Sequence, residues 1–571
     1  MALSRSVEVE TTFWPAPNTA TPDLQALPGI TEIASTKTFQ LEATYFDTPD
    51  LRLSRAGISL RYRTGGHDSG WHLKRPVSTV NNLGEQANQR QEITLSFKEY
   101  PASTEVPPPL LDEVFAYLMG QSLTPVSKLE TTRTETLLAA ADATIKAAFC
   151  DDQVISTALL PGGVLKQWRE WELELAEPVE KGSQGEKLLD GFNKLASDLG
   201  AHLPEIPSKF QNSIAEALAT APTPLPPKRW QPATKYDLDF AQFINSFQAH
   251  HQKLLVLDGA VRGGDNQASA QMREEVGVLV EILRYLASLF PNPAAEISEL
   301  GTLLSELDTV LAANDFAQQE QAALMRLLAR PAASLVDYKA RKRLINSTLS
   351  RSKRHQKRQK LGLEVPPYMA LLSGLENLAA NFPIPSAEIR QNLLSGLFTN
   401  LEHTWAQFNE TERVLLQELN NPKTDISATM PLLGTHLQAA FQLQAQATVL
   451  SDITDSKVFP SEKLLQSCKY ISYDIKAAIG ALNASTLILR RSDAARRHHE
   501  DSFAYGLLYE AARHLALYRI SRAEDTGDIA AKAWHKLQKT HHKLVNKAQK
   551  TKKGKKAKKI KKPKKTKAAK L

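Results

Sequence analysis

Charged side chains of one sign recur at two-residue spacing in several short segments near the start of the chain. They are Glu8 and Glu10 in VEVETTF, Arg61 and Arg63 in SLRYR, and Glu170, Glu172 and Glu174 in REWELEL. Clustered carboxylates are ligands for hard divalent cations such as Mg²⁺ and Mn²⁺, and guanidinium groups pair with phosphate oxygens. If both sets faced one cavity, that cavity would bind a polyanion together with a metal ion.

The segments that carry these charges alternate charged and apolar residues, which is the pattern of a β-strand. Residues two apart on a strand share a face and lie roughly 6–7 Å from each other. Two arrangements fit this pattern. Each strand packs its apolar face on a core and shows its charges to water, or the strands close into a barrel with the charges inside and helices outside. Several strands with charge of a single sign favour the barrel.

The hydrophobic periodicity changes along the chain and predicts its organisation. Residues 1–218 are strand-rich and predict an antiparallel β-barrel (tunnel) domain of the α+β class. A proline-dense stretch at residues 219–236 predicts a linker. Residues 237–546 space their apolar residues three and four apart and predict an all-helical (all-α) bundle. The Lys-rich residues 547–571 cannot bury apolar surface, and we expect them to be a disordered tail.

Composition separates an acidic body from a basic tail. The formal charge is +8, yet residues 550–571 contain 13 lysines and no acid, so the rest of the chain carries a net −5. Such an arm binds polyanions with strong salt dependence, including nucleic acid non-specifically. Cys150 and Cys468 are too few for a disulfide framework, and no signal peptide or membrane span is apparent. We therefore expect a cytoplasmic protein.

Seven motifs in residues 5–215 appear in an order that resembles the CYTH domain, the fold of the triphosphate tunnel metalloenzymes. The motifs are the Glu-x-Glu strand, YFDTPDLRLSRAGISLRYR, GWHLKRP, NQRQEI, TTRTE, WELEL and PSKFQ, which contains Ser208 and Lys209. The chain departs from the pattern twice. Thr12 stands where the family has a lysine. At CDDQ, ungapped matching puts Cys150 at the position of the family aspartate, and a one-residue shift puts Asp151 there.

The resemblance implies metal-dependent hydrolysis of inorganic triphosphate or a related triphosphate, with Mg²⁺ or Mn²⁺ as cofactor. The implied metal ligands are Glu8, Glu10, Glu172 and Glu174, with Glu92, Asp151 and Glu170 as further candidates. The implied phosphate-binding residues are Arg61, Arg63, Lys74, Arg90, Arg133 and Lys209. Among these, Arg61, Arg63 and Lys74 would stabilise charge on the transferred group. Adenylate cyclisation and thiamine triphosphate hydrolysis remain open, because phosphate-binding residues do not report what is attached to the triphosphate.

A CYTH-like domain followed by a helical region resembles the CYTH–CHAD architecture, in which the helical domain is implied to bind polyphosphate. The first-helix motif keeps Arg273, but Ala270 replaces its histidine, and Gly277 and Val278 stand where arginines belong. Basic charge is concentrated elsewhere, and the candidates for a polyanion-binding surface are Arg343, Arg354, Arg358, Arg496 and Arg497. The alternatives are a solvated basic face, a polyphosphate-binding or granule-associated protein without turnover, and a nucleic-acid-associated protein acting through its tail.

Overall fold

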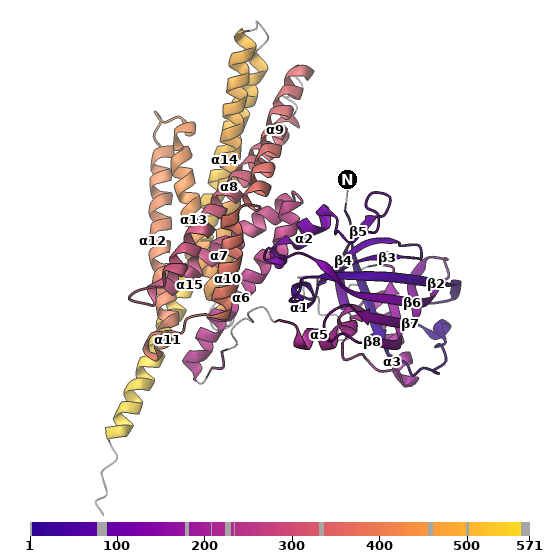
Figure 1. Cartoon of the computed structure of the whole chain (residues 1–571). Coiled ribbons are helices and arrows are strands. Elements are labelled where there is room, and N and C mark those ends of the chain that lie inside the picture. Colours follow the sequence, from indigo (N-terminus) through magenta and orange to yellow (C-terminus); the bar gives the residue numbers. More distant parts are fainter. Residues whose placement is uncertain are drawn as a thin grey trace, which may run out of the picture. The chain divides into compact units, whose positions relative to one another are not determined.

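The computed structural model of the protein describes residues 3–76, 88–177, 182–206, 208–222, 230–232, 234–330, 336–454, 461–497 and 502–560, without the side chains of 88, 235, 236 and 544–560. The chain divides into two compact units, Met1–Pro226 and Pro227–Leu571 (Figure 1).

The first unit is a closed barrel of eight antiparallel strands. The strands are β1 (Ser4–Phe13), β2 (Glu32–Asp47), β3 (Ser59–Thr64), β4 (Gly70–Pro76), β5 (Asn88–Ser96), β6 (Thr124–Ala139), β7 (Ile145–Ala158) and β8 (Leu165–Leu175). Around the barrel they follow the order β1-β5-β4-β3-β2-β6-β7-β8. The predicted antiparallel barrel is confirmed, and it has no open sheet edge.

The apolar faces of the strands point outward, where short helices cover them. These helices are η1 (Leu24–Ala26), α1 (Arg52–Arg55), α2 (Pro108–Leu118), α3 (Gln184–Asp198), α4 (Lys209–Ser213) and α5 (Ala215–Thr220). Phe13 and Phe149 both pack edge-on against Phe192 of α3, and Trp171 belongs to the same buried cluster. Because the hydrophobic core lies outside the strands, the alternate side chains point into the barrel.

Helix α4 follows the barrel strands and brings a lysine to them. The Ser208 hydroxyl caps the helix by accepting from the backbone N–H of Gln211. Phe210 stacks on Tyr45 of β2 with ring centroids 4.6 Å apart. This packing fixes Lys209, the first residue of the helix, against the interior of the barrel.

The second unit is all-helical, as predicted. Its elements are α6 (Lys235–Arg262), α7 (Asn266–Ser288), α8 (Ala295–Leu328), α9 (Tyr338–Gly362), α10 (Pro366–Ala380), α11 (Ala387–Gln391), α12 (Leu393–Leu419), η3 (Ile426–Thr429), α13 (Met430–Ile453), α14 (Glu462–Arg497) and α15 (Phe503–Ile560). One buried cluster runs through α8, α9, α12, α13, α14 and α15. Within the described residues, no helix combines the length and apolarity of a membrane span.

Helix α15 reaches into the segment for which the sequence predicts disorder. Its backbone remains helical as far as Ile560, and residues 561–571 lie outside the described part of the chain. Lysine and alanine have high helix propensity, and adding residues to an existing helix avoids the cost of nucleation. A helix already stabilised by packing can therefore continue into a Lys-rich segment.

Candidate active site

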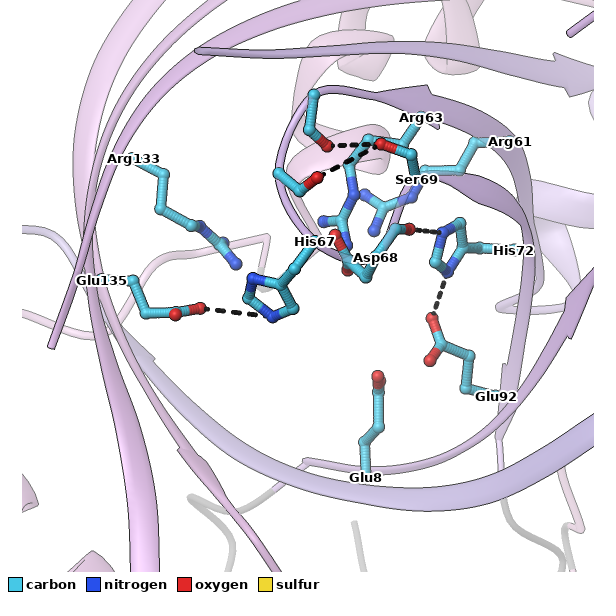
Figure 2. A network of polar contacts seen from close by, with 12 residues as sticks. Glu8, Arg61, Arg63, His67, Asp68, Ser69, His72, Glu92, Arg133 and Glu135 are labelled. Atoms are coloured by element: carbon cyan, nitrogen blue, oxygen red, sulfur yellow. Dashed lines mark hydrogen bonds and ion pairs between the residues drawn. The ribbon is translucent and has the colours of Figure 1, made fainter. Parts of the chain in front are cut away.

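The barrel encloses a cavity of about 380 Å³ that gathers charged side chains from most of its strands (Figure 2). Its acidic lining residues are Glu8, Glu10, Asp68, Glu92, Glu135, Asp152, Glu172 and Glu174, and its basic ones are Arg61, Arg63, His67, Lys74, Arg90, Arg133 and Lys209. Every phosphate-binding residue that the family resemblance implies is in this set. The four implied metal ligands and Glu92 are there too.

The cations of β3 lie side by side in this interior. Arg61 donates to the Tyr45 hydroxyl (2.8 Å). Burial alone would lower the pKa of Arg61, but Tyr45 and the carboxylates of Glu92 and Glu8 outweigh burial and raise it. Burial, with repulsion from Arg61 and Arg133, lowers the pKa of Arg63 to about 9. The guanidinium groups are therefore crowded, and an anionic ligand would relieve their repulsion.

On the β1 side of the cavity, Glu8 and Glu92 share the single ammonium of Lys74. The Lys74 Nζ lies 2.5 Å from Glu8 and 3.9 Å from Glu92, and His72 Nδ1 lies 2.9 Å from Glu92. Burial raises the pKa of Glu8 to about 8, because the Lys74 charge does not offset burial and repulsion from Glu92 and Glu174. Lys74 alone therefore does not compensate the negative charge of Glu8, and a divalent cation would supply the missing positive charge.

Glu10 and Glu174 face each other across β1 and β8. Neither makes an ion pair with any residue that the structure describes. Burial raises the pKa of Glu174 despite Lys74, and repulsion from Glu10 and Glu172 adds to the effect. Uncompensated carboxylates from adjacent strands fit a hard divalent cation. Together with Glu8, these two residues are the acids in the tunnel best suited to hold one.

A second acidic cluster at β7 and β8 already has its cations. Oxygens of Asp152, Glu170 and Glu172 lie within 4.8 Å of one another. The Lys209 Nζ lies among them, 3.1 Å from Asp152, 2.5 Å from Glu172 and also in contact with Glu170. Arg133 donates to Asp152 (2.8 and 2.6 Å) and to Glu172 (2.8 Å). A metal ion at this cluster would have to displace an ammonium, which makes the site less suitable than the Glu8 side.

Two of the further metal candidates, Asp151 and Glu170, are not among the residues that line the cavity. Asp151 is on the outer face of the barrel and forms a salt bridge with Arg169 (2.6 Å). The next residue, Asp152, takes the interior position instead. Glu170 points inward but is only 2% exposed, and it accepts from the Trp168 indole (2.6 Å).

Sequence reasoning missed Asp152, and strand parity was the signal that could have found it. On a strand, an acid two residues from Cys150 shares its face, whereas an adjacent acid does not. Cys150 and Asp152 both line the cavity. Tyr45, which hydrogen-bonds Arg61, also went unrecognised.

Thr12 occupies the interior position where the related family has a lysine. It is 4% exposed and pairs with Glu172 across β1 and β8. Its hydroxyl oxygen has no hydrogen-bond partner among the described residues. The ammonium of Lys209 lies at the same glutamate, so this part of the tunnel receives its positive charge from α4 rather than from β1.

The helical unit holds a larger cavity, of about 580 Å³, whose charges are internally balanced. Its four lysine and arginine lining residues pair with acids as follows: Lys253 with Glu275 (3.7 Å), Arg273 with Asp308 (2.9 Å), Arg284 with Glu281, and Lys469 with Glu274 (3.5 Å). Gly277 and Val278, at the positions where the CHAD pattern has arginines, line the same cavity. It therefore lacks the excess positive charge that a polyanion needs.

The predicted polyanion surface consists of exposed residues on two helices. Helix α9 contains ten lysines and arginines and no acid. Arg343 and Arg358, both exposed, stand about 22 Å apart along its axis. Arg491 of α14 donates to Ser347 of α9 (2.5 Å), which brings the last turns of α14 close to α9. Arg496 and Arg497 end α14, and Arg496 pairs with Asp493.

The barrel is closed, and carboxylates and cations from its strands line one interior cavity, so the first unit is a charge-lined tunnel. Comparison with known proteins gives a match to the CYTH domain over residues 7–201. An uncharacterized protein of Mycobacterium tuberculosis strain CDC 1551 is 30% identical over 389 residues, which cover 66% of this chain and 71% of that protein. An uncharacterized protein of strain H37Rv matches to the same extent. The chain therefore belongs to the family of CYTH domain proteins, the triphosphate tunnel metalloenzymes.

Two solved structures are each similar to a part of the chain. One is a Hippeastrum protein described as an adenylyl cyclase with a dominant triphosphatase activity, at 16% identity and TM-score 0.23, covering 36% of this chain and 95% of that protein. The other is the CHAD domain from the plant Ricinus communis, at 16% identity and TM-score 0.33, covering 55% of this chain and 96% of that domain.

Proposed function

We propose that the barrel hydrolyses inorganic triphosphate, or a related triphosphate, in a reaction that requires Mg²⁺ or Mn²⁺. The observation that carries the proposal is an interior cavity whose lining brings five basic residues (Arg61, Arg63, Lys74, Arg90 and Arg133) together with the paired acids of β1 and β8. The charge on a transferred phosphoryl group is best stabilised by fixed cations and a metal ion in a site shielded from water.

The residues divide into two roles. Glu8, Glu10 and Glu174 would hold the metal ion, which supplies charge neutralisation and an activated water. Arg61 and Arg63 on β3, together with Arg133 on β6, would bind the phosphate oxygens. Lys74 bridges the two sets, because its ammonium contacts Glu8 on the acidic side. Glu172 and Asp152 act by holding Arg133 and Lys209 in place.

The test measures phosphate release from inorganic triphosphate, ATP and thiamine triphosphate with Mg²⁺ or Mn²⁺. The Glu8→Gln/Glu10→Gln variant keeps the size of both side chains and removes their charge, and we expect at least a 100-fold loss of rate. Asp142→Asn serves as the matched control, because Asp142 is exposed in the turn after β6. Equal rates in the double variant and the wild type would disprove the proposed metal site.

A tunnel that binds triphosphate without turning it over is the second candidate for the barrel. Two features favour this candidate. Thr12 replaces the lysine of the related family, and Glu172, which pairs with Thr12 across the strands, is already bound by the Lys209 ammonium instead of being free to bind a metal ion. Calorimetry distinguishes the two functions. Tripolyphosphate binding with no phosphate release from any of the three substrates supports the second candidate and contradicts the first.

We propose further that the helical unit binds polyphosphate on the α9 surface rather than in its own cavity. The support is the excess of cations on α9 beside the balanced charges of the cavity. Arg354→Glu/Arg358→Glu should weaken polyphosphate binding about 10-fold or more, because each reversal turns attraction into repulsion. Arg413→Glu/Lys423→Glu makes the same charge change at exposed positions of the same unit, and it should have little effect.

A further inference from the structure

The turn between β3 and β4, residues 65–69, bends into the mouth of the tunnel. Gly66, His67 and Asp68 belong to the cavity lining, and Figure 2 shows His67 and Asp68 projecting into the ring of the barrel. His67 lies 3.9 Å from Glu135 and packs edge-on against Phe39, with ring centroids 5.6 Å apart. The turn therefore contacts β2 and β6 across the opening.

Backbone interactions hold this turn in place. Gly65 has φ +79°, and a Cβ there would lie 2.0 Å from the carbonyl oxygen of Gln40, so only glycine fits. The Ser69 hydroxyl donates to the Gly65 carbonyl (2.9 Å). His72 Nε2 donates to the Asp68 carbonyl (2.9 Å). These contacts aim the side chain of Asp68 at the interior.

The carboxylate of Asp68 forms an ion pair with Arg63. The arginine side chain is 9% exposed and the aspartate side chain 42% exposed. Arg63 lies beside two like charges, Arg61 and Arg133, which makes it dependent on an anion nearby. Asp68 is thus an anion that the chain itself supplies to one of the arginines expected to bind phosphate.

We propose that Asp68 competes with phosphate for Arg63 and so sets the charge that a ligand must carry to occupy the tunnel. The inference rests on the proposed triphosphate binding and adds a specificity determinant to it. A terminal phosphate brings more charge and more oxygens to a guanidinium than a carboxylate does. A triphosphate therefore displaces Asp68 from Arg63, whereas a singly charged anion does not. The Asp68 side chain is 42% exposed, so it can rotate toward solvent while the backbone of the turn stays in place.

The test is a calorimetric titration of the full-length protein with tripolyphosphate. EDTA is present to prevent metal-dependent hydrolysis. Asp68→Asn keeps the shape of the side chain and removes the competing charge, and we expect the Kd to fall about 10-fold, which corresponds to about 1.4 kcal/mol. Asp142→Asn is the matched control. It removes one negative charge at the same end of the barrel, in the β6–β7 turn, and should leave the Kd within about two-fold of wild type.

A double variant separates competition at Arg63 from a general change of potential. In an Arg63→Gln background, Asp68→Asn should lose its gain in affinity, because the shared partner is gone. An equal gain in both backgrounds overturns the proposal, as does an unchanged or weaker affinity of Asp68→Asn in a wild type that binds. Failure of wild type and all variants to bind tripolyphosphate, both in EDTA and with Mg²⁺, overturns the proposed function itself, and this inference with it.

Discussion

Asp151 and Asp152 are adjacent in the sequence and have opposite environments. Asp152 lies inside the barrel with Arg133 and Lys209, whereas Asp151 pairs with Arg169 outside. Burial raises the pKa of Asp152, but its two cationic partners outweigh burial and lower it. The stability that this group contributes is therefore present at neutral pH and is lost as the pH falls below the usual aspartate range.

The pair gives a matched test of which carboxylate supports the tunnel. Asp152→Asn leaves two buried cations with less compensation, and we expect it to lower the free energy of unfolding by about 3–5 kcal/mol and to weaken triphosphate binding. Asp151→Asn weakens a partly exposed salt bridge and should cost about 1 kcal/mol or less. Urea denaturation of both variants measures the difference. Equal losses would contradict the assignment of Asp152 to the interior.

His250 and His251 are also neighbours with opposite behaviour. Burial lowers the pKa of His250, but hydrogen bonds with Asp452 and Glu275 outweigh it and raise the pKa above the usual 6.5. Burial lowers the pKa of His251 to about 4. A raised pKa gives stability that is complete below about pH 6.5 and is lost as the pH rises through the folded value.

We expect the helical unit to become less stable as the pH rises above about 6.5, in part because His250 loses its proton. His250→Gln should flatten this slope in a plot of Tm against pH. His251→Gln should lower Tm by a similar amount at every pH in the range and leave the slope unchanged, because His251 is neutral throughout. A slope that survives in His250→Gln would contradict the ion-pair assignment.

At the scale of elements, α8 and α14 approach each other closely at a glycine. A Cβ on Gly480 of α14 would lie 2.6 Å from the carbonyl carbon and oxygen of Gln319 in α8. Backbone atoms cannot move away as a flexible side chain can, so any larger residue pushes the two helices apart. The close contact explains why a helix interior tolerates a residue of low helix propensity here.

Gly480→Ala should therefore destabilise the helical unit by about 2–3 kcal/mol, through overpacking. The control is Gly301→Ala in α8, where nothing lies within 4 Å of the added Cβ. That variant should gain about 0.5–1 kcal/mol, because alanine has the higher helix propensity. The denaturation midpoints of the two variants should shift in opposite directions, and a shift in the same direction would rule out the close crossing.

At the scale of the whole molecule, the chain has two strongly cationic segments, α9 and the Lys-rich residues 550–571. Removing residues 550–571 should leave polyphosphate binding in place but reduce its salt dependence, because fewer phosphates are neutralised. The measurement is the slope of log K against log salt concentration for the full chain and the truncated chain. Complete loss of binding on truncation would assign the binding to the tail instead of α9.

The sequence predicted the barrel and most of its interior because both follow from strand alternation. Glu8, Glu10, Arg61 and Arg63 needed only a period of two to be placed on one side. Asp152 was missed because motif matching near CDDQ ignored the parity of the strand.

Other features depend on tertiary packing, which has no local signal. Lys209 was expected to bind phosphate, yet its position among three acids follows from how α4 packs on Tyr45. The ion pair between Asp68 and Arg63 depends in the same way on a turn folding back over the opening. The continuation of α15 to Ile560 reflects propagation of a helix from packed residues, which composition does not reveal.

The position of Lys209 decides where the barrel can be cut from the rest of the chain. The match to the CYTH domain ends at residue 201, so a fragment with that boundary keeps all eight strands and loses α4. Asp152, Glu170 and Glu172 would then lie buried without the ammonium between them. Such a fragment should be more stable in mild acid, where protonation relieves the repulsion, than at neutral pH. A fragment that ends at Pro226 retains α4 and α5, so a barrel that keeps its Lys209 extends beyond the residues that match the CYTH domain.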